Sequence, residues 1–188
     1  LLIGELGLDG SLQPIRGALP IAIKARKEGY KGMILPRANA CEAAVVNNLE
    51  IYGMDSLAEV VQFLSGQIEA SPLEYDTRKV FYEQQASGSD LDLADVKGQD
   101  SVKRAMEVAA AGGHNMIMIG PPGSGKSMMA KRLPSILPPL SLAESLETTQ
   151  IHSIAGKLGS KNGNASALIT QRPFRSPHHT ISQVTLIY

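Results

Sequence analysis

Hydrophobic and polar residues alternate in short blocks over residues 1–65, and this pattern predicts a compact α+β unit. Residues 2–13 are strand-like around Asp9-Gly10, a pair that favours the tight turn of a β-hairpin. Apolar residues then recur with helical spacing over residues 18–27, and Gly29 is placed to end that helix. We therefore expect a hairpin followed by a helix.

Four further elements are expected before residue 65. Asn39 and Ser56 are residue types that favour the N-terminus of a helix, and each precedes or opens a segment of helical periodicity. Glu59 stands three positions after Ser56, which predicts a capping box. The expected elements are strands at 32–36 and 50–53 and helices at 39–46 and 57–64.

The pattern changes in residues 66–90, where polar residues dominate and no period holds. This predicts a linker, with 84–90 as its flexible part. Regular patterning resumes at residue 91, so we expect two domains, 1–65 and 91–188, joined by 66–90. The elements expected in the second are helices at 99–111, 126–133 and 141–152, a buried strand at 114–119 and a mobile hairpin or loop at 156–167.

Composition adds few constraints. Hydrophobic residues make up 43% and charged residues 19%, as in a soluble globular protein, and 18 basic residues balance 18 acidic ones. No apolar run reaches the roughly 18 residues that span a membrane. The single Cys41 cannot form an internal disulfide, which fits the reducing cytoplasm, and we expect its side chain to be buried. The chain lacks an initial Met and stops within an apolar run, so we interpret it as a piece of a longer protein.

The strongest signal of chemistry is the segment Gly120–Ser127, which meets the pattern G-x-x-x-x-G-K-[ST] at every fixed position. It follows the expected strand and opens the expected helix, which is the context that a phosphate-binding loop requires. The sequence therefore predicts a site for a nucleoside triphosphate, ATP with Mg²⁺. The loop consists of Gly120, Pro121, Pro122, Gly123, Ser124, Gly125, Lys126 and Ser127.

The residue types of the loop match the chemistry of phosphate binding. Glycines let backbone N–H groups converge on an anion, and the following helix adds partial positive charge at its N-terminus. Lys126 is expected to reach the β- and γ-phosphates, and the Ser127 hydroxyl to bind Mg²⁺.

Hydrolysis of ATP needs acidic residues that this chain lacks in the expected context. Such a carboxylate pair usually ends a second apolar strand, whereas Glu144 and Glu147 fall on a predicted helix. We therefore expect no catalytic residue within this chain. It carries the binding half of an ATPase whose turnover belongs to the full-length protein.

Several motifs resemble the ComM/YifB family of magnesium-chelatase-like AAA+ ATPases. Residues 92–99, Asp-Leu-Ala-Asp-Val-Lys-Gly-Gln, look like the segment that opens an AAA+ domain. The resemblance implies that Val96 and Gln99 border the adenine. Three strings make it specific: Gly112–Asn115, the phosphate loop, and Arg172–Ser182.

Residues 4–17 resemble the C-terminal half of a Lon-protease domain, which ComM/YifB proteins carry ahead of the ATPase. The resemblance places the catalytic lysine of Lon at Leu19, or at Pro20 with a shift of one. Neither residue can activate a serine, so a non-catalytic domain is implied. The expected fold class is α/β: an incomplete P-loop AAA+ domain preceded by the C-terminal part of an α+β Lon-like domain.

The resemblance implies a motor that acts on DNA, in branch migration or helicase-type remodelling during recombination or transformation. It also implies self-association as a ring, expected to be a hexamer, in the full-length protein. Two alternatives remain. One is a metal-chelatase motor subunit that remodels a partner enzyme, against which the Lon-like domain argues. The other is an ATP-dependent peptidase, which the absent lysine disfavours.

The Arg172–His179 segment has two interpretations. Its prolines hold it extended. It is either a structural hairpin on the AAA+ core or a pore or subunit-interface element that touches nucleic acid or a neighbour's nucleotide. In the second case the contacts are Arg172, Arg175, His178 and His179. Adjacent His side chains of an extended segment point to opposite faces, which argues against a shared metal.

Overall fold

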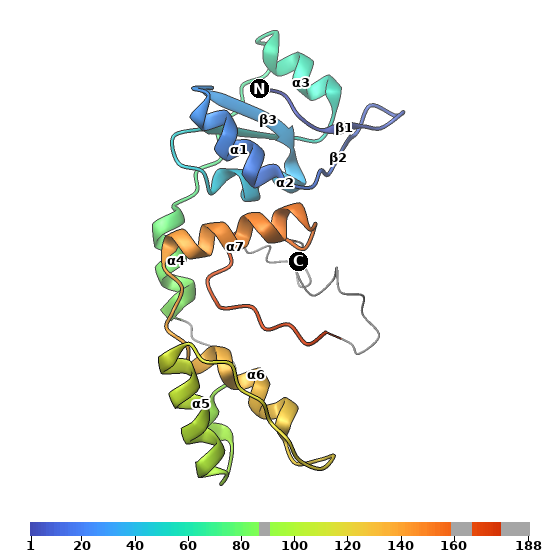
Figure 1. Cartoon of the computed structure of the whole chain (residues 1–188). Helices are drawn as coiled ribbons and strands as arrows, with labels where there is room; N and C mark the ends of the chain where they lie inside the picture. The colour runs from blue at the N-terminus through green and yellow to red at the C-terminus, as the bar shows by residue number, and fades with distance from the viewer. Residues whose placement is uncertain (87–90, 159–166, 178–188) are drawn as a thin grey trace. The chain divides into compact units, whose positions relative to one another are not determined.

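The computed structural model describes residues 1–86, 91–158 and 167–177 (Figure 1). It has a mixed α/β fold with two small sheets, which confirms the expected α/β class at this level. The described residues form two compact units. Unit 1 contains residues 1–82 with 142–158 and 167–169, and unit 2 contains 83–86, 91–141 and 170–177.

The centre of unit 1 is a parallel pair of strands, β3 (Gly32–Pro36) and β4 (Glu50–Met54). Residues 1–3 run parallel to β3, since the Ile3 N–H donates to the Ile34 carbonyl at 3.0 Å. The expected hairpin is confirmed: β1 (Glu5–Leu6) pairs antiparallel with β2 (Leu12–Gln13). The turn between them uses Gly10 at φ 83°.

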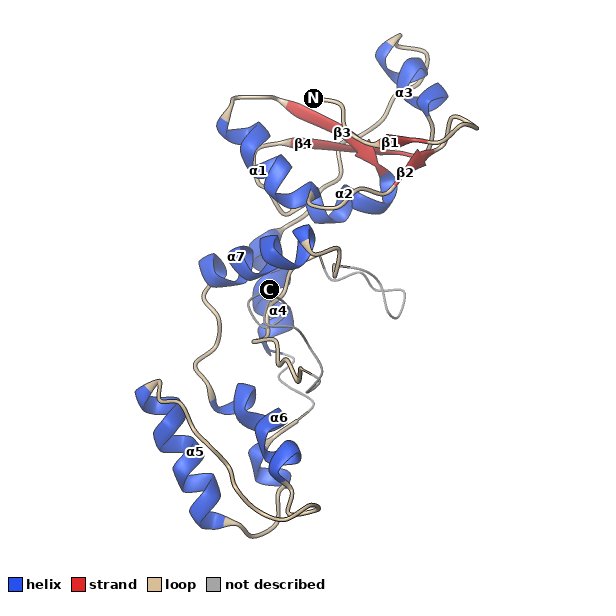
Figure 2. Cartoon of the chain, turned by 45° about the vertical axis from the view of Figure 1, so that its right-hand side comes forward, coloured by secondary structure: helices blue, strands red, loops and turns tan. Residues whose placement is uncertain are grey.

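Helices cover both faces of the β3–β4 pair (Figure 2). Successive strand residues point to opposite faces, so Met33 and Leu35 pack in one cluster and Ile34 packs in another. The first cluster lies against α1 (Ala18–Lys27) and α2 (Arg37–Ala44), and the second against α3 (Leu57–Leu64).

The expected caps of this unit are partly right. Ser56 caps α3, because its hydroxyl accepts the Glu59 N–H at 3.2 Å. The prediction for Asn39 is wrong, because α2 already begins at Arg37 and Asn39 lies inside it, buried. Its amide instead bridges the backbone of Ile15, accepting from N–H and donating to C=O at 2.9 Å each. Tertiary contact thus outweighs the capping preference. Cys41, which we expected to be buried, is exposed.

Two later helices add to unit 1. α7 (Leu142–Ile154) packs against α1 and presents a stripe of small polar residues at every fourth position: Ser145, Thr149 and Ser153 are all buried. α4 (Thr77–Ala86) lies in the range expected to be a linker; its residues 77–82 belong to unit 1, where Phe81 joins the main core. Its Thr77 hydroxyl donates to the Val45 carbonyl at 2.8 Å. The expected flexible residues 87–90 and most of the expected loop at 156–167 lie outside the described residues.

Unit 2 contains a 3₁₀ turn, η1 (Leu93–Asp95), and the helices α5 (Asp100–Gly112) and α6 (Lys126–Ile136). Its core joins Leu93, Val96, Met106 and Met129. Both helices lie where the sequence predicts them, within a few residues at their ends.

The strand expected at 114–119 is not formed among the described residues, and its burial was predicted wrongly. Met116 and Met118 pack on the core of unit 2, whereas Ile117 and Ile119 are 82% and 89% exposed. The segment therefore keeps the alternation of an extended chain. A strand also needs a hydrogen-bonded neighbour, and no described residue pairs with this segment.

No helix within the described residues is long and apolar enough to cross a membrane.

Candidate functional site

The phosphate-binding pattern folds into a loop that ends at the first turn of α6. Gly123 and Gly125 have φ of 80° and 84°, a left-handed conformation that a side chain disfavours. Gly125 is also the residue that caps α6, and the first turn of this helix carries no acidic side chain. The N–H groups that begin an α-helix have no partner within it, so they stay available to an anion here.

Lys126 places its positive charge in the middle of this loop. The ammonium Nζ donates to the Gly120 carbonyl at 2.9 Å and to the Pro121 carbonyl at 2.8 Å. It also lies 3.2 Å from the Ser124 hydroxyl. Ser127 follows in the first turn of α6 and is exposed. The Lys126 ammonium, the N-terminus of α6 and the exposed Ser127 side chain thus lie within one turn of chain. Groups of these kinds bind a polyphosphate and its Mg²⁺.

A cavity of about 430 Å³ opens beside the loop. Its apolar wall comes from α5 and from the extended segment before the loop, and its polar wall from Gln99, Ser124 and Lys126. This volume lies within the roughly 300–1,000 Å³ of sites for small molecules, which are mostly apolar with a few polar groups. The site therefore has room for the part of a nucleotide that lies beyond its phosphates.

The structure separates the two residues that were expected to border the base. Gln99 lines the cavity, has φ 58°, and donates from Nε2 to the Ser124 carbonyl at 3.3 Å. The Val96 side chain is buried in the core of unit 2 instead, and its carbonyl accepts a hydrogen bond from the Lys103 ammonium.

The arginines of the 172–175 segment do not line the phosphate-loop cavity. Arg172 donates to the Pro138 carbonyl at 2.8 Å, and Arg175 is exposed. His178 and His179 lie outside the described residues. Among the residues that are described, no group of three His, Cys, Asp or Glu side chains could hold a metal ion.

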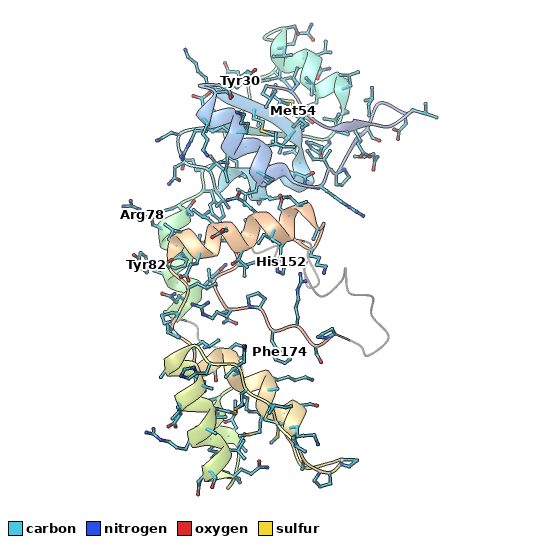
Figure 3. The ribbon with its side chains drawn as sticks, viewed as in Figure 1. Tyr30, Met54, Arg78, Tyr82, His152 and Phe174 are labelled. Carbon is cyan, nitrogen blue, oxygen red and sulfur yellow. The ribbon has the colours of Figure 1, made fainter. Side chains whose placement is uncertain are left out.

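Phe174, labelled in Figure 3, was not singled out in the sequence. It lines a second cavity of about 440 Å³ in unit 2, together with His114, Asn115 and residues of α6. Two segments almost sixty residues apart, Gly112–Asn115 and the stretch around Phe174, are thereby brought together. No local pattern signals such a contact.

A buried polar cluster in unit 1 was also missed. Glu42 on α2 is 9% exposed and accepts three hydrogen bonds. The donors are the Leu19 N–H at 3.0 Å, the Asn39 amide at 3.3 Å and the Ser153 hydroxyl. Gly17, the N-cap residue of α1, has no side chain, so Glu42 caps that helix from another element by accepting the Leu19 N–H. A lone acid among alanines in Ala-Cys-Glu-Ala-Ala was the available signal.

Comparison with known proteins covers nearly the whole chain. Residues 92–188 match the family described as magnesium chelatase, subunit ChlI, and residues 1–39 match a second family described as subunit ChlI of Mg-chelatase. An uncharacterized protein of Mycobacterium tuberculosis is 41% identical over 187 residues, which is 100% of this chain and 35% of that protein.

Two further relatives have names. The competence protein ComM of Haemophilus influenzae is 39% identical over 186 residues, covering 98% of this chain and 35% of ComM. The uncharacterized protein YifB of Escherichia coli is 38% identical over 192 residues, covering 99% of this chain and 34% of YifB. The chain thus spans about a third of the length of these relatives.

Proposed function

Because the chain belongs to the magnesium-chelatase-like family that includes ComM and YifB, we propose that its unit 2 binds ATP with Mg²⁺ at the loop Gly120–Ser127. One observation carries the proposal. Lys126 is the first residue of α6, and its ammonium lies within hydrogen-bonding distance of three loop atoms. Family membership supports the use of ATP and Mg²⁺ in general.

Each group of the proposed site has a distinct role. The backbone N–H groups of residues 120–125 hold the phosphate oxygens, and Lys126 neutralises the β- and γ-phosphates. Ser127 offers its hydroxyl to Mg²⁺, and Gln99 with the apolar wall of the cavity contacts the nucleoside. ATP supplies a phosphoanhydride bond, whose hydrolysis drives conformational change in motors of this kind.

Calorimetric titration of the chain with ATP and Mg²⁺ tests this proposal. Lys126→Ala removes the cation at the centre of the loop, so we expect binding to become undetectable. Lys131→Ala is the matched control, because Lys131 lies on the same helix and is exposed. Unchanged affinity in the Lys126 variant would contradict the assignment of the site.

We propose the same domain organisation as the sequence suggests: a Lon-like domain at 1–65, a connecting segment at 66–90 and an AAA+ domain at 91–188. A non-catalytic role for the first domain is supported by Leu19, the position of the catalytic lysine in Lon. Its side chain is fully buried in the main core, and its N–H is bonded to Glu42. Neither this position nor Pro20 offers a base to a serine.

For the full-length protein we propose an AAA+ motor, assembled as a ring, that remodels DNA. The name of the competence protein ComM supports this substrate, because competence is the uptake of DNA. In this reading Arg175 and the residues His178 and His179 are candidate DNA contacts, and Arg172, bonded to Pro138, positions that segment. The description of the matched family favours a second candidate, a motor subunit of a metal chelatase.

The ATPase rate of the full-length protein separates these two candidates. A DNA motor is expected to turn over ATP faster with forked or single-stranded DNA present. A rate that DNA leaves unchanged would reject the DNA motor and favour a protein as the remodelled substrate.

A further inference from the structure

Arg132 connects α6 to a part of unit 2 that lies forty residues earlier in the chain. Its Nε donates to the Asp92 carbonyl at 2.8 Å, and its guanidinium lies 3.8 Å from the Asp95 carboxylate. A second nitrogen donates to the Met128 carbonyl of α6 itself at 3.2 Å. The Arg132 side chain is only 15% exposed, whereas the Asp95 side chain is 56% exposed.

The partner of Arg132 is a short segment that depends on such contacts for its conformation. Asp92 and Asp95 form a reciprocal capping box around η1, in which the Asp95 carboxylate accepts the Asp92 N–H at 3.2 Å. Arg132 therefore holds both the carbonyl of Asp92 and the carboxylate that fixes its N–H. The same segment continues to Gln99, which lines the cavity beside the phosphate loop.

Lys126 and Arg132 both lie on α6, so the end of the phosphate loop and the backbone at Arg132 keep a fixed spacing. The two residues are six positions apart, or about 9 Å along the helix axis. Arg132 thus links the helix that follows the loop to the segment that leads to Gln99, the one residue of 92–99 that lines the cavity. A planar guanidinium suits this role, because its fork bonds several acceptors at once.

We propose that Arg132 is a positioning residue for the nucleoside part of the nucleotide. It holds residues 92–99 against α6 so that Gln99 faces the base and ribose while the loop binds the phosphates. This inference rests on the proposed binding of ATP. It assigns Arg132 no contact with the nucleotide itself, and it predicts that affinity for the nucleoside and affinity for the phosphates respond differently to its loss.

Titration with two probes tests this separation. ATP requires the loop together with Gln99 and the rest of the cavity, whereas inorganic tripolyphosphate requires the loop alone. Arg132→Met is expected to weaken ATP binding about tenfold, the effect of one lost hydrogen bond to a charged group. Binding of tripolyphosphate is expected to stay within about twofold, since the loop keeps its groups. Arg132→Lys retains one donor and should fall between wild type and Arg132→Met for ATP.

Arg104→Met is the matched control. Arg104 is 76% exposed and pairs with Glu107 on its own helix, so its loss should leave both affinities unchanged. The inference is overturned if Arg132→Met weakens both probes in parallel, because Arg132 would then support only the fold, or if it weakens neither. If Arg132→Met does not fold, Arg132→Lys decides, and wild-type affinity for ATP in that variant overturns the inference. A wild-type chain that binds tripolyphosphate and ATP equally also overturns it, whereas one that binds neither contradicts the proposed function itself.

Discussion

Replacing Glu42 with Ala is expected to destabilise unit 1 far more than a typical surface change. The carboxylate is buried and accepts hydrogen bonds from Leu19, Asn39 and Ser153, which belong to three different helices. Alanine offers no acceptor, so three donors lose their partner at once. One of them is the N–H at the start of α1, which has no intrahelical alternative.

The size of the effect follows from those three donors. A hydrogen bond to a charged group contributes about 1.5–3 kcal/mol, and a buried donor without a partner costs about 1–3 kcal/mol. Water can satisfy part of this demand, because Glu42 is 9% exposed. We therefore expect Glu42→Ala to lower the free energy of unfolding by about 3 kcal/mol, out of the roughly 5–15 kcal/mol typical of a domain. Glu42→Gln should lose about half as much, since an amide keeps one acceptor oxygen.

Two measurements check this expectation. Urea unfolding followed by circular dichroism gives the free energy, and hydrogen exchange at the Leu19 amide reports on unit 1 specifically. The second measurement is needed because two compact units can unfold in separate steps. Glu28→Ala is the control: Glu28 forms an exposed pair with Lys24 on α1, and its loss should change stability by less than about 0.5 kcal/mol. Unaltered stability and unaltered Leu19 protection in Glu42→Ala would refute the assigned role of the cluster.

Two further predictions concern the loop and one tyrosine. Gly125→Ala should weaken ATP binding about tenfold in calorimetric titration, because a side chain in the left-handed region costs about 1–2 kcal/mol; its Cβ would also lie 3.4 Å from Gln99 Nε2 and from Met128 Cε. A Gly125→Ala chain with wild-type affinity would show that the backbone of the loop rearranges freely. Burial, and secondarily the nearby Cys41, raises the pKa of Tyr75. Its contribution to stability is therefore full below the unfolded pKa of about 10 and is lost as the pH rises through the higher folded pKa. The difference in tyrosinate absorbance between wild type and Tyr75→Phe should show this delayed titration, and a transition at the ordinary tyrosine pKa would contradict it.

The features that sequence predicted well are those decided by a few neighbouring residues. The turn at Asp9-Gly10, the cap at Ser56 and the start of α6 after Gly125 all depend on backbone angles within one turn of chain. A glycine with positive φ or a hydroxyl before a helix works in the same way wherever it occurs. The structural effect of such residues can therefore be predicted from the local sequence.

The features that sequence missed depend on residues far apart in the chain. Asn39 has the side chain of a helix cap, but contact with Ile15 uses its amide for another purpose. An isolated glutamate in the sequence suggests a surface position, and only the contacts of Glu42 with α1 and α7 show that it is buried. The apolar run before the phosphate loop predicts a buried strand. Burial of Ile117 would require neighbouring strands, and the periodicity of one segment does not predict whether such neighbours are present.

The contact between Glu42 and Ser153 also affects when unit 1 can finish folding during synthesis. The two residues are 111 positions apart, and the whole phosphate loop lies between them in the sequence. A chain grows at about 5–20 residues per second, so the ribosome completes the loop about 1–5 seconds before it completes α7. During that interval the Glu42 carboxylate lacks the Ser153 donor, and the face of α1 that α7 covers is open to water or to a chaperone. Unit 1 can therefore complete its packing only after the loop Gly120–Ser127 has emerged.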